Sequence, residues 1–280
     1  MAEFSKVTGT AVDHPDGQFR PWALGDYGRV AMALQPVADR LVARLGDLSG
    51  QEILDVATGT GNVALAAVRA GATVVGVDLT PELLAVARDR TDASGLRVDY
   101  RLGDAEALPV TDASFDVVAS VFGVMFAADH QRGADELVRA CRPGGTIALV
   151  NWVPDGALAT FAGLISAALP SPAGAASPGL WGRESYVRSL LEPRGVRVEL
   201  FNDQVTWEAE SAEAYLATRE EIQGSLVAAH RRLGPGPQWD ELRRRLLEVL
   251  EAGNEATASF RVSSNALVAI GRVRQSGEPA

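Results

Sequence analysis

The stretch DVATGTGN, residues 55–62, decides the expected fold because it joins an apolar strand pattern to a helical pattern. Its two glycines, Gly59 and Gly61, let a ligand approach the backbone closely, since neither carries a Cβ atom. The spacing fits the G-x-G-x-x-A form of a dinucleotide fingerprint, and it also fits a loop for a different nucleoside cofactor. The loop alone does not distinguish between these two ligands.

Short apolar strands and helical segments alternate around this loop. The expected strands cover residues 52–57, 73–77, 96–102, 115–121, 146–152, 196–201 and 265–273. The expected helices cover residues 63–70, 132–141, 183–192, 211–233 and 238–252, and another begins at Thr80-Pro81. This rhythm predicts an α/β protein with right-handed βαβ units and a mostly parallel, doubly wound sheet covered on both faces.

The segments outside this alternation give weaker patterns. Residues 1–20 show little apolar periodicity, and we expect a flexible N-terminus there. Residues 22–45 are predicted to be helical, with Pro36 dividing the helix. Residues 170–179 are rich in Pro, Gly, Ala and Ser and are expected to form a loop, and the longer stretch 154–181 is a candidate lid.

Composition and charge narrow the class of partner. The chain has 280 residues, of which 47% are hydrophobic and 22% charged, with a net charge of −10. A protein that binds a phosphate backbone is normally basic, so we expect no nucleic-acid partner. No run approaches the roughly 20 apolar residues of a membrane span, so we expect no membrane association either. A single cysteine, Cys141, excludes a disulfide within the chain, and we expect a cytoplasmic monomer or homodimer that acts on a small molecule.

Acidic residues stand at the ends of three expected strands. A carboxylate at Asp78, 19 residues after Gly59, can accept hydrogen bonds from both ribose hydroxyls of NAD or of another adenosine cofactor. Asp104 is not part of the dinucleotide fingerprint, but it could accept from an adenine amino group while the Ala105 N–H donates to the ring. Asp55 would repel a pyrophosphate and favour a cationic amino-acid group. These residues predict a ligand with an adenosine half and a cationic half.

Five motifs that carry this pattern follow one another along the chain: DVATGTG at 55–61, Asp78, Asp104-Ala105, FDVV at 115–118 and RPGG at 142–145. In these motifs the chain resembles the class I S-adenosylmethionine-dependent methyltransferases, in particular the ubiquinone/menaquinone-biosynthesis-like (methyltransferase type 11) branch. The resemblance covers about residues 50–152, and it departs from the family at Ala57-Thr58, where a Gly or Cys pair is often found.

The resemblance implies a Rossmann-like methyltransferase fold with seven strands, an N-terminal helical cap and a helical insertion before the last strand. It also implies a flexible segment at 1–20 followed by a single domain over 21–280, with a cofactor-binding core at 50–152. The remaining segments, at 21–49, 153–195 and 206–262, would then be cap or acceptor-binding elements. The implied cofactor is S-adenosylmethionine, which leaves as S-adenosylhomocysteine.

The same resemblance implies which residues bind the cofactor: Tyr27, Asp55, Ala57, Thr58, Gly59, Gly61, Asp78, Leu79, Gly103, Asp104, Ala105 and Val121. The glycine loop and Val121 would lie against the methionine part, with Asp55 orienting its amino end. Asp78 would hold the ribose, Leu79 would pack on the adenine, and Asp104 with Ala105 would bind the adenine edge. Tyr27 lies in the segment WALGDY, at 22–27, which resembles the segment that covers the cofactor.

Methyl transfer from a sulfonium is a one-step displacement, so the protein mainly has to align the acceptor, an effect worth about 7–11 kcal/mol in favourable models. A general base is needed only when the acceptor must be deprotonated, and His130 is the one candidate, with a loop or capping role as the alternative. The three histidines lack metal-ligand spacing, so no metal site is predicted. The candidate acceptor-binding residues are all aromatic or apolar: Phe122, Met125, Phe126, Trp152 and Trp181.

The leading hypothesis is therefore a methyltransferase that acts on a small hydrophobic or aromatic molecule, such as a secondary metabolite. The alternatives are an NAD-dependent oxidoreductase, a member of the same fold that keeps the cofactor without methylating, and a protein or nucleic-acid methyltransferase. For each acceptor candidate, packing in the core is a competing interpretation. The sequence leaves open which molecule is the acceptor and whether O, N or C is methylated.

Overall fold

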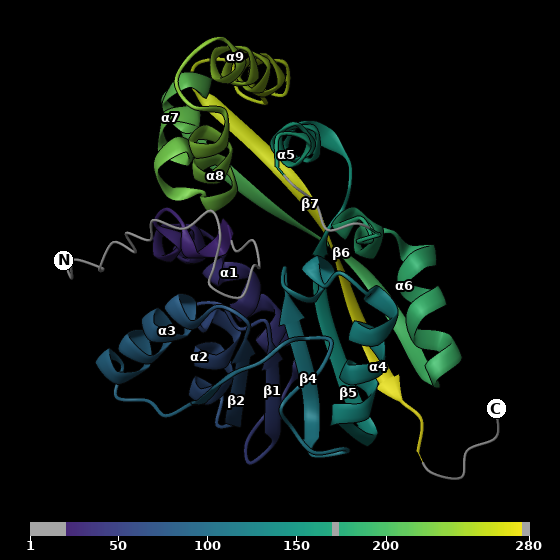
Figure 1. Cartoon of the computed structure of the whole chain (residues 1–280). Helices are drawn as coiled ribbons and strands as arrows, with labels where there is room; N and C mark the ends of the chain where they lie inside the picture. Colours follow the sequence, from purple (N-terminus) through teal and green to yellow (C-terminus); the bar gives the residue numbers. More distant parts are fainter. Residues whose placement is uncertain (1–20, 170–173, 276–280) are drawn as a thin grey trace. The chain divides into compact units, whose positions relative to one another are not determined.

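The computed structural model describes residues 21–169 and 174–275, and within them the chain forms two compact units (Figure 1). The larger, here called the sheet unit, comprises residues 34–154, 174–203 and 266–275. The smaller, here called the helical unit, comprises residues 21–33, 155–169 and 204–265. The flexible segment expected at 1–20 lies outside the described residues, and the single domain expected over 21–280 stays a prediction.

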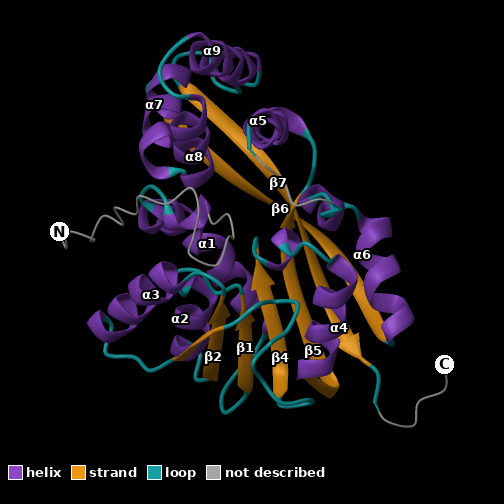
Figure 2. Cartoon of the chain, in the orientation of Figure 1, coloured by secondary structure: helices purple, strands orange, loops and turns teal. Residues whose placement is uncertain are grey.

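Seven strands form one sheet in the order β3-β2-β1-β4-β5-β7-β6 (Figure 2). Their bounds are β1 (Glu52–Val56), β2 (Thr73–Asp78), β3 (Asp99–Leu102), β4 (Phe115–Val121), β5 (Cys141–Trp152), β6 (Val196–Ala209) and β7 (Phe260–Val273). The pairs β1–β2, β1–β4, β2–β3 and β4–β5 are parallel, whereas β7 runs antiparallel to β5, with Trp152 opposite Ala266. The predicted mostly parallel seven-stranded sheet is confirmed.

The centre of the sheet is apolar because both of its faces are covered. Leu54 on β1 and Val118 on β4 are fully buried, as expected of central parallel strands. Four helices alternate with the strands: α2 (Asn62–Arg69), α3 (Pro81–Ala93), α4 (His130–Ala140) and α6 (Glu184–Leu191). Helix α2 packs on β1, β2 and β4, and α4 packs on β4, β5 and α6. These elements fix the strand ends of the sheet unit, where the candidate site lies.

The helical unit has an apolar core of its own. Its helices are α5 (Gly156–Ala167), α7 (Ala212–Ile222), α8 (Gly224–Leu233) and α9 (Pro237–Ala252). They bury a cluster that includes Phe161, Leu216, Leu226, Leu246 and Phe260. Helices α7 to α9 lie between β6 and β7 in sequence, which confirms the predicted helical insertion before the last strand. Across the described ranges, no helix is both long and apolar enough to cross a lipid bilayer.

Two expectations about single elements are wrong. Pro36 lies inside one continuous helix, α1 (Tyr27–Leu45), and does not divide it. Burial of its neighbours Val37 and Ala38 offsets the backbone hydrogen bond that a proline removes. The expected helix at 211–233 is two helices, α7 and α8, which meet at Gln223. Helix α5, which was not predicted, lies within the candidate lid segment 154–181 and buries Phe161 and Ile165 at helical spacing.

Candidate functional site

The candidate site lies in the sheet unit, at the carboxyl ends of β3, β2, β1 and β4. These four parallel strands are neighbours in the sheet, so the residues that follow them share one edge. This edge holds eleven of the sequence-predicted cofactor residues: Asp55, Ala57, Thr58, Gly59, Gly61, Asp78, Leu79, Gly103, Asp104, Ala105 and Val121. Tyr27, which begins α1, belongs to the helical unit, and its contact with the cofactor stays a prediction.

The glycine loop uses several of its backbone amides internally. The Thr58 N–H donates to the Val77 carbonyl oxygen at 2.9 Å, and the Gly61 N–H donates to the Thr58 carbonyl oxygen at 2.9 Å. The Gly59 N–H donates to Asp78 Oδ2 at 2.8 Å. Phosphate sites at a strand–loop–helix junction depend on free amides of this kind. Here the Gly59 amide is already bound to the Asp78 carboxylate and is not free for a pyrophosphate, which disfavours a dinucleotide.

Asp55 is turned into the fold and shapes the loop. Its Oδ2 accepts a hydrogen bond from Thr58 Oγ1 at 2.6 Å and from the Ala64 N–H at 3.1 Å, at the start of α2. The residue is 1% exposed, and this burial raises its pKa to about 7, with a small further increase from the nearby charge of Asp78. Its predicted role in orienting an amino group of the ligand stays a prediction.

Asp78 ties the end of β2 to the glycine loop. Besides the Gly59 amide, its carboxylate accepts the Thr80 N–H through Oδ1 at 2.8 Å. Burial raises the pKa of Asp78, and its backbone hydrogen bonds oppose that rise. The next residue, Leu79, is 36% exposed, so it presents an apolar surface on which a flat ring could pack.

Asp104 begins a tight turn after β3. Its Oδ1 accepts from the Glu106 N–H at 2.9 Å, and its carbonyl oxygen accepts from the Ala107 N–H at 3.0 Å. Just before it, the Gly103 N–H donates to the Asp78 carbonyl oxygen at 3.0 Å and joins the ends of β2 and β3. A Cβ atom at Gly103 would lie 2.5 Å from Pro109 Cδ, so glycine is required there. Asp104 and Ala105 stay half-buried, which leaves room for the predicted contact with adenine.

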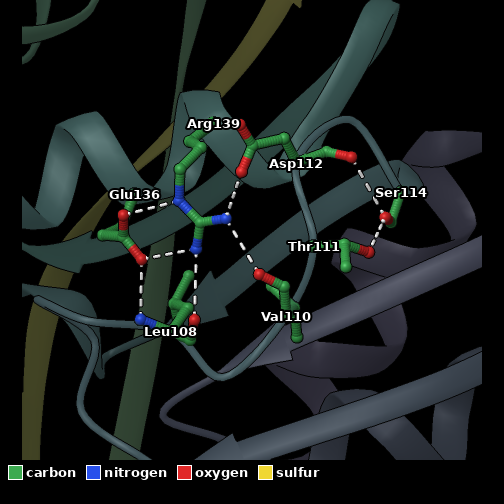
Figure 3. A network of polar contacts seen from close by, with 7 residues as sticks. All are labelled: Leu108, Val110, Thr111, Asp112, Ser114, Glu136 and Arg139. Carbon is green, nitrogen blue, oxygen red and sulfur yellow. Dashed lines mark hydrogen bonds and ion pairs between the residues drawn. The ribbon is translucent and has the colours of Figure 1, made fainter.

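Arg139 on α4 fastens the segment that follows this turn (Figure 3). Its Nε and Nη2 donate to the two Glu136 carboxylate oxygens at 2.6 and 2.7 Å. Nη1 donates to Asp112 Oδ1 and to the Val110 carbonyl oxygen, and Nη2 also donates to the Leu108 carbonyl oxygen. All five N–H donors of the guanidinium are therefore used. The sequence analysis missed Arg139, although the Glu136-x-x-Arg139 spacing on a predicted helix was a weak signal.

Arg90 on α3 holds the glycine loop from outside, and the sequence analysis missed it as well. Its Nη1 donates to the Thr60 carbonyl oxygen at 2.6 Å, to Thr60 Oγ1 at 2.9 Å and to Asn62 Oδ1 at 2.8 Å. Its Nη2 donates to Gln35 Oε1 on α1 at 3.2 Å. A basic residue near the end of a helix gives no sequence signal for such a contact.

Two residues without glycine's freedom adopt left-handed backbone at this edge. The φ angles are +54° at Ala57, after β1, and +53° at Phe122, after β4. Such angles cost about 1–2 kcal/mol for an L-residue and tend to occur at functional sites. A Cβ atom at Gly123 would lie 2.5 Å from the Ala57 Cβ. Ala57 therefore fits where the family often has glycine because Gly123 has no side chain.

The predicted acceptor residues do not form one group. The Phe122 and Trp152 rings are stacked, with centroids 3.6 Å apart and planes 6° from parallel, and Phe126 is 42% exposed. Met125 and Trp181, however, are 2% and 0% exposed and belong to the core of the sheet unit. Direct acceptor contact is not supported for these two residues, because packing encloses their side chains.

His130 is also placed differently from the prediction of a general base. Its Nε2 lies 3.2 Å from the Met125 carbonyl oxygen, to which it can only donate, so its Nδ1 accepts from the Tyr186 hydroxyl at 3.0 Å. The residue is 2% exposed, and burial lowers the pKa of the imidazole. Both ring nitrogens are used by the fold, so the geometry favours the structural alternative.

Comparison with known proteins agrees with the motifs. Residues 54–149 match the family model described as a methyltransferase domain. The uncharacterized protein Rv1405c of Mycobacterium tuberculosis is 48% identical over 172 residues, which are 61% of this chain and 63% of that protein. A demethylmenaquinone methyltransferase of Thermus thermophilus is 42% identical over 106 residues, 37% of this chain and 48% of that enzyme. The chain thus spans less than two thirds of the curated relatives it matches.

The fold is shared more widely than the sequence. The structure of the YcgJ protein from Bacillus subtilis has a TM-score of 0.61 at 18% identity and covers 85% of this chain and 98% of its own. The family match begins in β1 and ends in β5, so it contains the glycine loop and all three acidic strand ends. Through this segment the chain is similar to the class I S-adenosylmethionine-dependent methyltransferases.

Proposed function

We propose that this protein transfers a methyl group from S-adenosylmethionine to a small hydrophobic or aromatic acceptor by direct displacement. One observation carries the choice of cofactor: the Gly59 and Ala64 amides, at the loop and the start of α2, already donate to Asp78 and Asp55. These two amides are therefore not free to bind a phosphate, and the Asp78 carboxylate stands beside the glycine loop. Such an edge suits a cationic, phosphate-free ligand and repels the pyrophosphate of NAD.

The residues of this edge fit the parts of the cofactor. The second lone pairs of the Asp78 carboxylate oxygens remain available to the ribose hydroxyls, and Leu79 offers an apolar surface beside them. Gly59 and Ala57 are half-exposed and place backbone, with little side chain, against the methionine part. When bound, the cofactor supplies an electrophilic methyl group on a sulfonium.

The contribution of the chain to the reaction would be alignment and exclusion of water. The stacked Phe122 and Trp152 rings form an apolar pair where β4 and β5 end. His130 does not provide a base, because both of its ring nitrogens are hydrogen-bonded within the fold. We therefore expect the pH dependence of turnover to follow the acceptor and not this histidine.

Isothermal titration calorimetry with S-adenosylhomocysteine and NAD tests the cofactor. We expect S-adenosylhomocysteine to bind and NAD not to bind. Asp78→Asn should weaken binding about tenfold or more, since an amide cannot accept from both Gly59 and Thr80 and still hold two hydroxyls. Asp99→Asn is the matched control, because Asp99 is an exposed carboxylate on β3 that pairs with Arg101. If NAD binds and S-adenosylhomocysteine does not, the proposal is overturned. If S-adenosylhomocysteine binds, a mass-shift screen of candidate molecules with S-adenosylmethionine identifies the acceptor.

A further inference from the structure

A second polar feature, in the helical unit, is not explained by the cofactor site. Arg219 on α7 is 7% exposed, yet the ion pairs formed among the described residues do not include it. A buried charge without a counter-charge is costly, and proteins normally pair it or neutralise it. Arg219 is therefore a candidate for a counter-charge that the described part of the chain does not supply.

Two aromatic rings of the same unit flank the guanidinium. The Arg219 Cζ atom lies 4.8 Å from the centroid of the Tyr215 ring and 5.3 Å from that of the Trp207 ring. Ring faces stabilise a cation but supply no negative charge. The Arg219 guanidinium has five N–H donors, and a side-chain hydrogen bond joins it to Tyr215. The other donors form a planar fork that suits a carboxylate.

The paired acidic residues of α7 and β6 in the helical unit do not neutralise Arg219, because they form ion pairs with other arginines. Within the helical unit, the ion pairs on α7 and β6 are Glu213 and Glu220 with Arg243, Glu221 with Arg29, and Glu208 with Arg261. Among the described residues, these carboxylates thus pair with three other arginines, and Arg219 is left with aromatic faces. This arrangement is typical of a site that receives an anion carrying apolar surface.

We propose that Arg219, Tyr215 and Trp207 form a binding site for the carboxylate of an aromatic or similarly apolar acid. Because residues 206–262 are also expected to bind the methyl acceptor, the acceptor itself would be an apolar carboxylic acid. This conclusion about the acceptor rests on the proposed function, whereas the anion site does not.

The test compares 2-naphthoate with 2-naphthamide, which have nearly the same shape and differ in charge. Ligand-observed NMR titration of the wild-type protein should show 2-naphthoate binding at least tenfold more tightly. Arg219→Gln should abolish this preference, and Arg219→Lys should retain part of it. Arg244→Gln is the matched control, since Arg244 is exposed and paired with Glu241 and Glu248. Equal affinity of the two probes for the wild type, or a preference that survives in Arg219→Gln, would overturn the proposal.

A second measurement does not depend on whether Arg219→Gln folds. Saturating 2-naphthoate should raise the melting temperature of the wild type by several degrees more than 2-naphthamide does. An equal shift with both probes would contradict the site. Calorimetry with S-adenosylhomocysteine separates the two proposals, because Arg219→Gln should bind it as the wild type does. If the wild type fails to bind S-adenosylhomocysteine but prefers 2-naphthoate, the proposed function fails and the anion site stands.

Discussion

Arg139 in the sheet unit and Arg219 in the helical unit are both withdrawn from solvent, but the chain treats them in opposite ways. The side chain of Arg139 is 28% exposed, and all five of its donors find acceptors in the chain. Arg219 is more deeply buried, and its neighbours are two ring faces and one hydroxyl. Arg139 is fully hydrogen-bonded within the chain, whereas the contacts of Arg219 with described residues leave N–H donors for a ligand.

The two regions therefore differ in whether the chain itself satisfies their polar groups. At the sheet edge, amides, carboxylates and guanidinium groups bind one another, so the chain itself sets the geometry that the cofactor would meet. In the helical unit, no described residue supplies a counter-charge for Arg219, so a ligand would complete the site. We expect four measurable consequences.

The largest effect is expected from Gly61→Ala in the glycine loop. Gly61 has a φ of +85°, and a Cβ atom there would overlap the Tyr100 hydroxyl, which is held at 3.0 Å from Thr91 Oγ1. The left-handed backbone costs about 1–2 kcal/mol and overpacking about 1–3 kcal/mol, so urea unfolding should show a loss of about 2–5 kcal/mol. Gly46→Ala is the control, with a φ of +83° and open space around it. Equal losses in the two variants would show that the loop is less rigid than we describe.

Arg139→Met and Arg219→Met compare the two arginines directly. The first should lower the free energy of unfolding by about 2–3 kcal/mol, because Glu136 and two carbonyl oxygens lose their cation. The second should change it by no more than about 1 kcal/mol, or raise it, since an unpaired buried charge is removed. Chemical denaturation of both variants measures this. A larger loss from Arg219→Met would give that residue a structural role.

Asp55 should make stability depend on pH. Because its pKa is raised to about 7 in the folded state, the folded protein holds the proton more tightly than the unfolded chain does. The stability that Asp55 contributes is therefore present below about pH 4 and is lost as pH rises through about 7. Between pH 5 and pH 7 the wild type should lose about 2 kcal/mol relative to Asp55→Asn. Denaturation of both proteins across this range tests the sign, and parallel pH curves would refute it.

The smallest effect is expected from Arg90→Gln. This change removes the donors to Thr60 and Asn62 and should weaken S-adenosylhomocysteine binding about tenfold, or about 1.4 kcal/mol, by loosening the loop. Arg88→Gln is the control on the same helix, since Arg88 donates to the Tyr100 carbonyl oxygen and not to the loop. Calorimetry that finds equal affinities in the two variants would remove Arg90 from the positioning of the loop.

The parts of the fold that could be predicted from the sequence are those with local causes. The strand at 115–121 was predicted at its observed bounds because a buried central strand is apolar along its whole length. The glycine loop and Asp78 were located by spacing alone. Arg90 and Arg139 could not be found in this way, because most of their acceptors lie far away in sequence, and the one local pair, Glu136 with Arg139, is also typical of an exposed helix.

Side-chain roles were harder to predict than positions. His130 lies on the correct edge of the sheet, but its hydrogen bonds to Met125 and Tyr186 depend on tertiary packing that no local pattern encodes. The same holds for Trp181, whose burial is decided by α6 and the core around it. Helix α5 was missed because Pro-, Gly- and Ala-rich sequence around it favoured a loop.

The close approach of Ala57 and Gly123 has a consequence for how this site can change. A first substitution of Gly123 to alanine would meet the Ala57 Cβ at 2.5 Å, whereas Ala57→Gly removes that atom and relieves the left-handed backbone. After Ala57→Gly, the same change at Gly123 should cost much less, so the two effects are not additive. The order of substitution therefore matters: an evolving lineage could move the methyl group from one strand end to the other through a glycine at both positions, and not through an alanine at both.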